Sequence, residues 1–348
     1  MGSAPAAPGG VVRRGPAPGF CAGVLRRVLR RGRPRPVVAP SRGAAVGAPW
    51  STGRVESTET PAAGYDPLFL GAPVPLPRPR AGGAGGDLVE LPSTHFTVLL
   101  DRRRRLAAAT AVVVDGARLR DLPRSGDWRP DPRVAVHEQA GEELYARNDL
   151  DRGHLVRRRD PVWGTVEEAA RAEADTFTYP NAAPQASAFN QSRELWLGLE
   201  DHVLAAAEVG RRRLAVLTGP VLAVDDPVYR GVQVPRLFWK VVAWSVPGPE
   251  GPRLAAVAHV LDQTPQLGSV DLQAAAARAA LADEPPPLGP FRTFAVPVGD
   301  VADLTGLDLG PLPAADVLVV PAGAVDDPAG GRARWREVRT LADVALGR

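Results

Sequence analysis

Cysteine and lysine are nearly absent from this chain of 348 residues, which has Cys21 and Lys240 as its single examples. One cysteine excludes an intramolecular disulfide and any zinc site built on several thiolates. Because Lys240 lies in a predicted strand, the chain has no phosphate-binding Gly-x-x-x-x-Gly-Lys loop. The patterns His-Glu-x-x-His and Gly-x-Ser-x-Gly are missing too, which excludes the usual zinc-protease and serine-hydrolase signatures. No run of eighteen apolar residues is present, so we expect no membrane span.

Acidic residues are missing from the N-terminal part of the chain. Residues 1–54 contain ten arginines and no Asp, Glu or Lys, so they carry +10. Since the formal net charge of the whole chain is +3, residues 55–348 carry −7. The pI of about 9.5 therefore describes the N-terminal part and does not indicate that the rest binds a polyanion. Any polyanion site in residues 55–348 must be local.

Residues 1–63 also lack aromatic and β-branched periodicity, and they are rich in Ala, Pro, Gly and Arg. Such a composition buries too little apolar surface to offset the entropy of ordering, so we expect a disordered extension. The hydrophobic content of 45% is enough for one folded domain, which we expect at residues 64–348. No apolar stretch follows a short basic start, so we predict no signal peptide and leave the location undetermined.

The predicted strands and helices are grouped along the chain and do not alternate strictly. The expected strands are His95–Leu100, Ala108–Val114, Arg213–Leu217, Leu237–Val246, Leu254–Asp262 and Phe291–Val296. The expected helices are Val166–Ala174, Glu194–Val209, Ser269–Ala282, Asp300–Thr305 and Trp335–Leu346. Residues 102–105 form a basic turn that is either solvated or touches phosphate, and the amide-rich residues 179–185 are expected to form a loop. This order predicts an α+β fold around a largely antiparallel sheet.

The sequence Asp151-Arg152-Gly153-His154 brings a cation, a glycine and a base together. If the segment is extended, Arg152 and His154 point to one face and Gly153 points to the other. Arginine offers a planar fork of donors to phosphate, and histidine takes up a proton near neutral pH. The pair suits phosphodiester cleavage, while Gly153 lets the chain approach its neighbours closely. The alternative is an ordinary turn and strand that contain a histidine.

Downstream of His154 lies a cluster of amides and a carboxylate, made of Asn181, Gln185, Asn190 and Glu200. Amide and carboxylate oxygens suit a hard cation such as Mg²⁺, which keeps several waters. On one unbroken helix Asn190 and Glu200 would lie roughly 15 Å apart, too far to bind one ion directly together. We therefore expect Asn190 as a direct ligand and Glu200 as a residue that holds water on the metal. The alternatives are a helix cap for Asn190 and a solvated helix face for Glu200.

These residues belong to a longer series of motifs. The series is Asp151-Arg152-Gly153-His154, Asn181-Ala182-Ala183-Pro184-Gln185, Phe189-Asn190-Gln191, Trp196-Leu197-Gly198-Leu199-Glu200, Leu217-Thr218-Gly219-Pro220, Phe238-Trp239-Lys240-Val241 and Asp262-Gln263-Thr264-Pro265. In this order it resembles the DNA/RNA non-specific endonuclease family, a branch of the ββα-metal or His-Me finger nucleases that also includes mitochondrial endonuclease G. The resemblance covers about residues 64–320 and is best over residues 94–320.

The resemblance implies a ββα-metal nuclease fold, with a central, largely antiparallel sheet flanked by helices, and Mg²⁺-dependent cleavage of DNA and RNA. His154 would be the general base that activates water, and Arg152 would stabilise the charged transition state. Asn190 would be the sole direct protein ligand of a hydrated Mg²⁺, for which Mn²⁺ could substitute, and Glu200 would order water on that ion. Asn181 and Gln185 match further active-site amides of the family.

Two positions depart from the family pattern. Asn190 and Glu200 are separated by two more residues than in the best-known members, which puts the placement of Glu200 in doubt. A family arginine upstream of the Asp-Arg-Gly-His motif is matched only by Arg124, in Pro-Arg-Ser-Gly-Asp-Trp.

The expected partner is nucleic acid, bound through its phosphates, so DNA and RNA could both be cut with little sequence preference. An inhibitor protein and a homodimer stay open as further partners. The alternative function is a catalytically silent nucleic-acid-binding module of the same fold.

Overall fold

The computed structural model divides the chain into two units, Met1–Thr58 and Glu59–Arg348, and every described residue lies in the second. The described residues are 64–81, 87–147, 150–186, 203–205, 207–249, 251–264, 267, 292–318 and 335–338. The expected disordered extension at residues 1–63 and the expected helix Ser269–Ala282 therefore lie outside them. Within these ranges no helix is long and apolar enough to cross a membrane.

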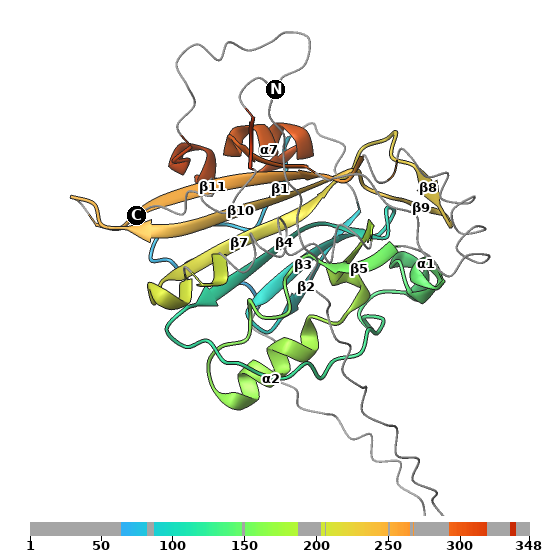
Figure 1. Ribbon diagram of the computed structural model, residues 1–348, viewed down its shortest axis with the longest axis horizontal. Helices are drawn as coiled ribbons and strands as arrows, with labels where there is room; N and C mark the ends of the chain where they lie inside the picture. The colour runs from blue at the N-terminus through green and yellow to red at the C-terminus, as the bar shows by residue number, and fades with distance from the viewer. Residues whose placement is uncertain are drawn as a thin grey trace, which may run out of the picture. The chain divides into compact units, whose positions relative to one another are not determined.

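An eight-stranded sheet forms the centre of the second unit (Figure 1). Its order is β14-β12-β11-β10-β7-β4-β3-β2, and every neighbouring pair is antiparallel. The bounds are β2 Leu88–Ser93, β3 Phe96–Asp101, β4 Leu106–Asp115, β7 Arg213–Val221, β10 Leu237–Val246, β11 Arg253–Asp262, β12 Arg292–Val296 and β14 Arg336–Glu337. This arrangement confirms the expected α+β class with an antiparallel sheet.

Both faces of the sheet are buried, because successive residues of its central strands enter two different cores. In β10, Trp239 and Val241 belong to one core and Phe238 and Val242 to the other. Alternating side chains of a strand point to opposite faces, so a strand covered on both sides is mostly apolar along its whole length. The long apolar runs of β4, β7, β10 and β11 are the result.

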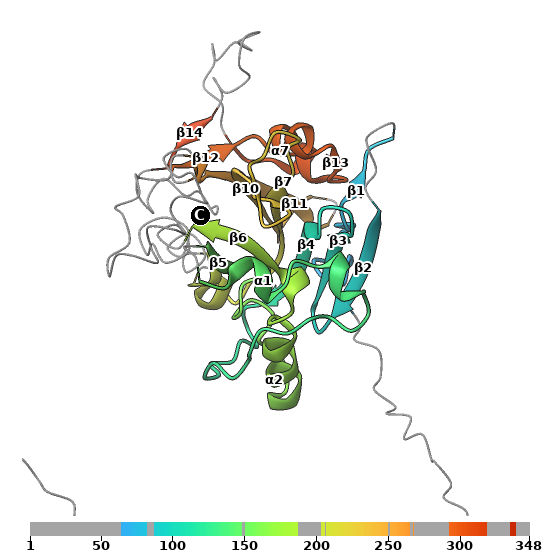
Figure 2. The same ribbon diagram turned by 90° about the vertical axis from the view of Figure 1, so that its right-hand side faces the viewer.

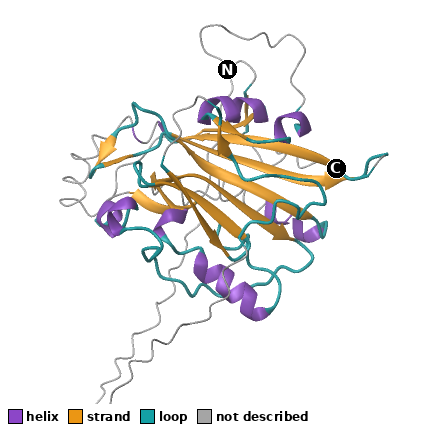
Figure 3. Ribbon diagram, turned by 180° about the vertical axis from the view of Figure 1, so that it is seen from behind, coloured by secondary structure: helices purple, strands orange, loops and turns teal. Residues whose placement is uncertain are grey.

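Different elements cover the two faces (Figures 2 and 3). Helix α7 (Val298–Thr305) and the 3-10 helix η3 (Leu312–Ala315) pack on the core that contains Trp239. A separate two-stranded sheet of β5 (Leu150–His154) and β6 (Ala182–Ala186) contributes Ala183 and Ala186 to the core that contains Phe238. The Asp-Arg-Gly-His motif is thus carried by a small two-stranded sheet, the β5–β6 sheet, which packs against one face of the large sheet.

Short elements complete the described part of the unit. They are β1 Arg78–Pro79, which pairs with β13 Leu307–Asp308, β8 Val228–Tyr229, which pairs with β9 Val232–Gln233, α1 Glu142–Tyr145, α2 Val166–Asp175, and the 3-10 helices η1 Val136–Glu138 and η2 Tyr179–Asn181. Helix α2 begins with the capping box formed by Thr165 and Glu168, because each side chain accepts a hydrogen bond from the other residue's backbone N–H. Gly306 ends α7 in the left-handed conformation, with φ of 65°.

Two sequence-based expectations about secondary structure are wrong. Residues 182–185 form most of strand β6 and not a loop, and β6 keeps Pro184 on its outer edge, where a missing N–H breaks no ladder bond with β5. The expected helix from Trp335 starts instead with β14, the edge strand of the large sheet, which pairs with β12. Residues 339–346 of that expected helix lie outside the described part of the chain.

The basic turn at residues 102–105 holds neighbouring loops in place. Arg104 donates to the carbonyls of Leu222 and Ala223 and to the side chain of Gln233. Arg105 donates to the carbonyl of Gln139 and pairs with Glu143 of α1. Arg104 and Arg105 therefore hold neighbouring segments of the chain together. The sequence had suggested only a solvated turn or a contact with phosphate.

Candidate active site

The β5–β6 sheet places Arg152 and His154 on one face. The guanidinium of Arg152 lies 5.3 Å from the ring centroid of Tyr145, and the His154 ring lies 4.5 Å from Trp128. Stacked aromatic rings connect the surroundings of Arg152 and His154. The ring centroids of Trp128 and Tyr179 are 6.3 Å apart, and those of Tyr179 and Tyr145 are 6.4 Å apart. The expected extended conformation and shared face are therefore both present.

His154 lies in an apolar and cationic surrounding. Its ring is tilted against Trp128 and meets Phe177 edge-on, with centroids 5.1 Å apart. The pKa of His154 is lowered to about 3, mainly because burial disfavours the imidazolium and further because Arg124 and Arg158 are cations. Its Nε2 is buried and makes no hydrogen bond. The structure thus presents a neutral imidazole with an unused ring nitrogen.

The depressed pKa predicts how His154 responds to acid. A neutral base is available above its pKa, so this residue should stay neutral as the pH falls through 6.5 and become charged only near pH 3. The measurement is an NMR titration of the free protein that follows the His154 ring resonance, assigned by its loss in His154→Gln. A midpoint at the ordinary value of 6.5 would contradict the burial of this ring.

Arg152 is oriented by groups that the motif did not reveal. It forms an ion pair with Glu142 of α1, and the hydroxyl of Tyr179 donates to the same carboxylate over 3.0 Å. These contacts hold the pKa of Glu142 below its usual value, with Arg152 as the main cause. Glu142 lies ten residues upstream of Arg152, so no local spacing signals the pairing.

Two further arginines lie near His154. Arg124 is exposed, and its guanidinium lies 5.0 Å from the ring centroid of Phe177, which itself touches His154. Arg158, which the sequence had not suggested, is held by Glu173 at 3.3 Å and by the carbonyl of Leu122 at 3.2 Å. Arg124, the only match for the missing family arginine, is therefore brought to the same place as His154.

Asn181 holds the chain that follows β5. Its Oδ1 accepts from the N–H of Val156 at 2.8 Å, and its Nδ2 donates to the carbonyls of Val156 and Thr176, each at 3.0 Å. The side chain is fully buried and its amide is engaged at both ends. The backbone of Asn181 also accepts from the N–H of Leu155, so this residue fixes the end of β5 at which His154 lies.

Gln185 lies on the opposite face of the β5–β6 sheet. A Cβ added to Gly153 would lie 2.0 Å from Oε1 of Gln185, so this side chain occupies the space that the missing Cβ leaves. That space is on the face away from Arg152 and His154. Gln185 is fully buried, and neither Oε1 nor Nε2 has a hydrogen-bond partner. The structure therefore places Arg124 beside His154 and Arg152 on the same face as His154, and it places Gln185 on the other face.

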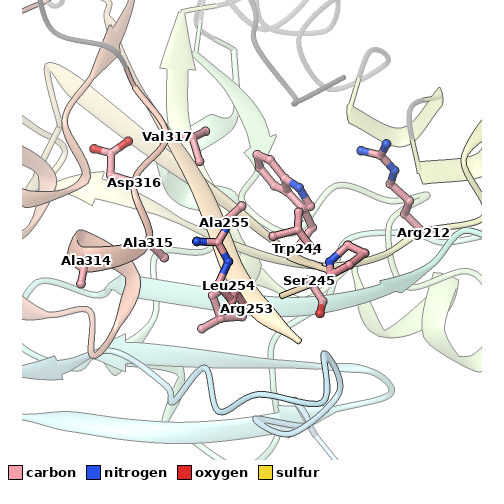
Figure 4. Close-up of a pocket in the computed structure, with 12 residues that line it drawn as sticks. Arg212, Trp244, Ser245, Arg253, Leu254, Ala255, Ala314, Ala315, Asp316 and Val317 are labelled. Atoms are coloured by element: carbon pink, nitrogen blue, oxygen red, sulfur yellow. The ribbon is translucent and has the colours of Figure 1, made fainter. Parts of the chain in front are cut away.

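The expected metal ligands Asn190 and Glu200 lie outside the described residues. Among the residues that are described, no group of three or more His, Cys, Asp or Glu side chains could hold a metal ion. A cavity of about 580 Å³ lies between the turn end of the β10–β11 hairpin and residues 314–317 (Figure 4). It is lined by residues such as Arg212, Trp244 and Arg253 and contains none of the expected site residues.

Comparison with known proteins gives the family. The model of the DNA/RNA non-specific endonuclease family matches residues 80–316. Uncharacterized protein y4fB of Sinorhizobium fredii is 34% identical over 301 residues, which cover 81% of this chain. The aligned part is 42% of that relative's length, so the chain spans less than half of it.

Two relatives with named activities match over shorter parts. Mitochondrial endonuclease G of Bos taurus is 27% identical over 52% of this chain and 66% of its own length. Salivary endonuclease of Lutzomyia longipalpis is 32% identical over 27% of this chain and 24% of its own length. Among solved structures, an EndoG/EndoGI complex has a TM-score of 0.46 and 18% identity, covering 63% of this chain and 84% of that one. Since the family model spans more than half of the chain, this protein belongs to the DNA/RNA non-specific endonuclease family.

Proposed function

We propose that this protein is an active, metal-dependent endonuclease that hydrolyses phosphodiester bonds in DNA and RNA without sequence preference. The observation that carries the proposal is His154, a neutral imidazole with an unused Nε2 next to the cations of Arg124 and Arg158. A neutral imidazole can accept a proton from water, and cations beside it attract the phosphate that this water attacks. Family membership supports the same class of reaction.

In this proposal His154 takes the proton of the attacking water. Because Nε2 is covered in the structure, side chains around it must move when the substrate binds. Arg152 would place its guanidinium fork against the phosphate, since Glu142 and the ring of Tyr145 already fix its orientation. Arg124, exposed above Phe177, would supply a second cation. Asn181 would act by holding the backbone beside His154, and Gln185 by packing behind Gly153.

Residues 190 and 200 would hold the metal ion, Asn190 directly and Glu200 through water. An amide oxygen and a carboxylate fit Mg²⁺, and also Mn²⁺, by their chemistry as hard oxygen donors. When bound, the ion would polarise the phosphate and neutralise charge that develops on the leaving oxygen. Asn190 follows the end of β6 by four residues, which gives it a reach of at most about 14 Å from Ala186.

The test compares nucleic acids and metal conditions. Purified protein is incubated with supercoiled plasmid and with RNA, in Mg²⁺, in Mn²⁺ and in EDTA. We expect both substrates to be degraded in either metal and to stay intact in EDTA. Intact plasmid and RNA under every condition would overturn the proposal, and a gel shift without cleavage would favour a silent binding module instead.

A further inference from the structure

The side chain of Gln263 links the outer edge of β6 to the end of β11. Its Oε1 accepts from the N–H of Ala186 at 3.1 Å, and its Nε2 donates to the carbonyl of Pro184 at 3.3 Å. The same Nε2 donates to the carbonyl of Pro235 at 2.5 Å. Gln263 is fully buried, so all of these bonds are shielded from water. The side-chain amide of Gln263 therefore makes the hydrogen bonds to β6 that a neighbouring strand would otherwise make.

This link matters because β5 and β6 form a sheet of their own, separate from the large sheet. Across the β5–β6 sheet, Pro184 pairs with Arg152 and Ala186 pairs with Leu150. Gln263 thus holds the half of this small sheet that carries Arg152. The half that carries His154 is held separately, by Asn181 and its bonds to the residues after β5.

Gln263 is itself firmly placed. It follows β11 in the centre of the large sheet, and its backbone N–H donates to the carbonyl of Arg236 at 2.9 Å. The preceding Asp262 pairs with Arg292 of β12 at 2.9 Å and accepts from the N–H of Thr264 at 2.9 Å. Because Gln263 is buried and its backbone is fixed in this way, its side chain can hold β6 in a defined position relative to the large sheet.

We propose that Gln263 is a positioning residue for the reaction: by clamping Pro184 and Ala186 to the end of β11, it sets where β5 presents Arg152. The inference rests on the role proposed above for Arg152. A displacement of about 1 Å can lower a rate about 100-fold when the displaced group must meet a transition state. The clamp matters for Arg152 and not for His154, which has its own anchor.

The test is a double-mutant cycle measured under single-turnover and steady-state conditions. We expect Gln263→Met, which keeps the volume and removes the three bonds, to lower kcat about 10-fold with little change in KM. Arg152→Ala should lower kcat about 100-fold, as the loss of one transition-state donor does. The double variant should match Arg152→Ala within about twofold, because Gln263 acts through Arg152.

Gln139→Met is the matched control. Gln139 is also buried and makes three side-chain bonds to the backbone, with Asp131 N–H, Asp131 carbonyl and Val134 carbonyl, but none of them reaches β5 or β6. It should lower the melting temperature as Gln263→Met does and leave kcat unchanged. A merely structural role for Gln263 would make the two variants alike.

The possible outcomes separate the two proposals. A folded Gln263→Met with the kcat of the parent protein, or a fully additive cycle, would overturn the role of Gln263 alone. Unchanged activity in Arg152→Ala would overturn both that role and the proposed function of Arg152. If Gln263→Met does not fold, Gln263→Asn replaces it, because the shorter side chain keeps an amide donor and acceptor but cannot reach Ala186 and the two carbonyls together, and the same loss of kcat is expected.

Discussion

Replacing His154 with alanine is expected to lower kcat by about 10³-fold, within the range that a positioned general base contributes. The physical reason is that the imidazole is neutral, with its pKa lowered to about 3, and has a ring nitrogen without a hydrogen-bond partner. No other described histidine is so placed next to Arg124 and Arg158. The measurement is initial-rate cleavage of plasmid and RNA at saturating Mg²⁺.

Two comparisons keep this result interpretable. His154 also packs against Trp128 and Phe177, so thermal unfolding of each variant shows whether a loss of rate comes from a loss of fold. His154→Gln keeps polarity and much of the volume but cannot serve as the base, and it should lose as much activity as alanine. His137→Ala, at an exposed residue of η1, should keep the parent rate. Parent-like cutting by a folded His154→Ala protein would show that another group activates the water.

Replacing Gly153 with alanine is expected to destabilise the fold by about 1–3 kcal/mol, as overpacking of a closed core does. The new Cβ would lie 2.0 Å from Oε1, 2.1 Å from Cδ and 2.7 Å from Cγ of Gln185. Since Gln185 is fully buried, it cannot swing into solvent to make room. Chemical denaturation would measure the change in the free energy of unfolding, and activity should fall with it because Arg152 and His154 flank this glycine.

A second substitution identifies the cause. In the double variant Gly153→Ala/Gln185→Ala, the shortened side chain at position 185 no longer meets the new Cβ. The double variant should therefore recover part of the stability that Gly153→Ala loses, so the effects of the two substitutions on the free energy of unfolding are not additive. Gly299→Ala is the matched control, because a Cβ there meets nothing within 4 Å and the residue lies in helix α7. It should leave stability unchanged or raise it slightly. Equal losses at Gly153 and Gly299 would exclude contact with Gln185 as the reason.

The sequence by itself determined the local features of this protein. Residue alternation in an extended segment put Arg152 and His154 on one face, because that period depends only on the strand itself. The capping box of Thr165 and Glu168 and the stop at Gly306 followed from local backbone groups in the same way. The class of the sheet followed from long apolar runs separated by turns.

Tertiary structure alone decided which groups meet at the site. Glu142 lies beside Arg152, and Arg158 beside His154, only because α1 and the loop after β5 fold back onto the β5–β6 sheet. The sequence did not predict strand β6, because the strand contains Pro184. The outer edge of β6 is hydrogen-bonded by the side chain of Gln263, which lies far away in the sequence. Gln185, grouped with His154 by sequence, faces the other side, since its direction is fixed by pairing with β5 and by the space at Gly153. The contacts of Gln263 and Gln185 join residues far apart in the chain, and those of Glu142 and Arg158 depend on how the chain bends between the partners. A local pattern carries no information about such partners.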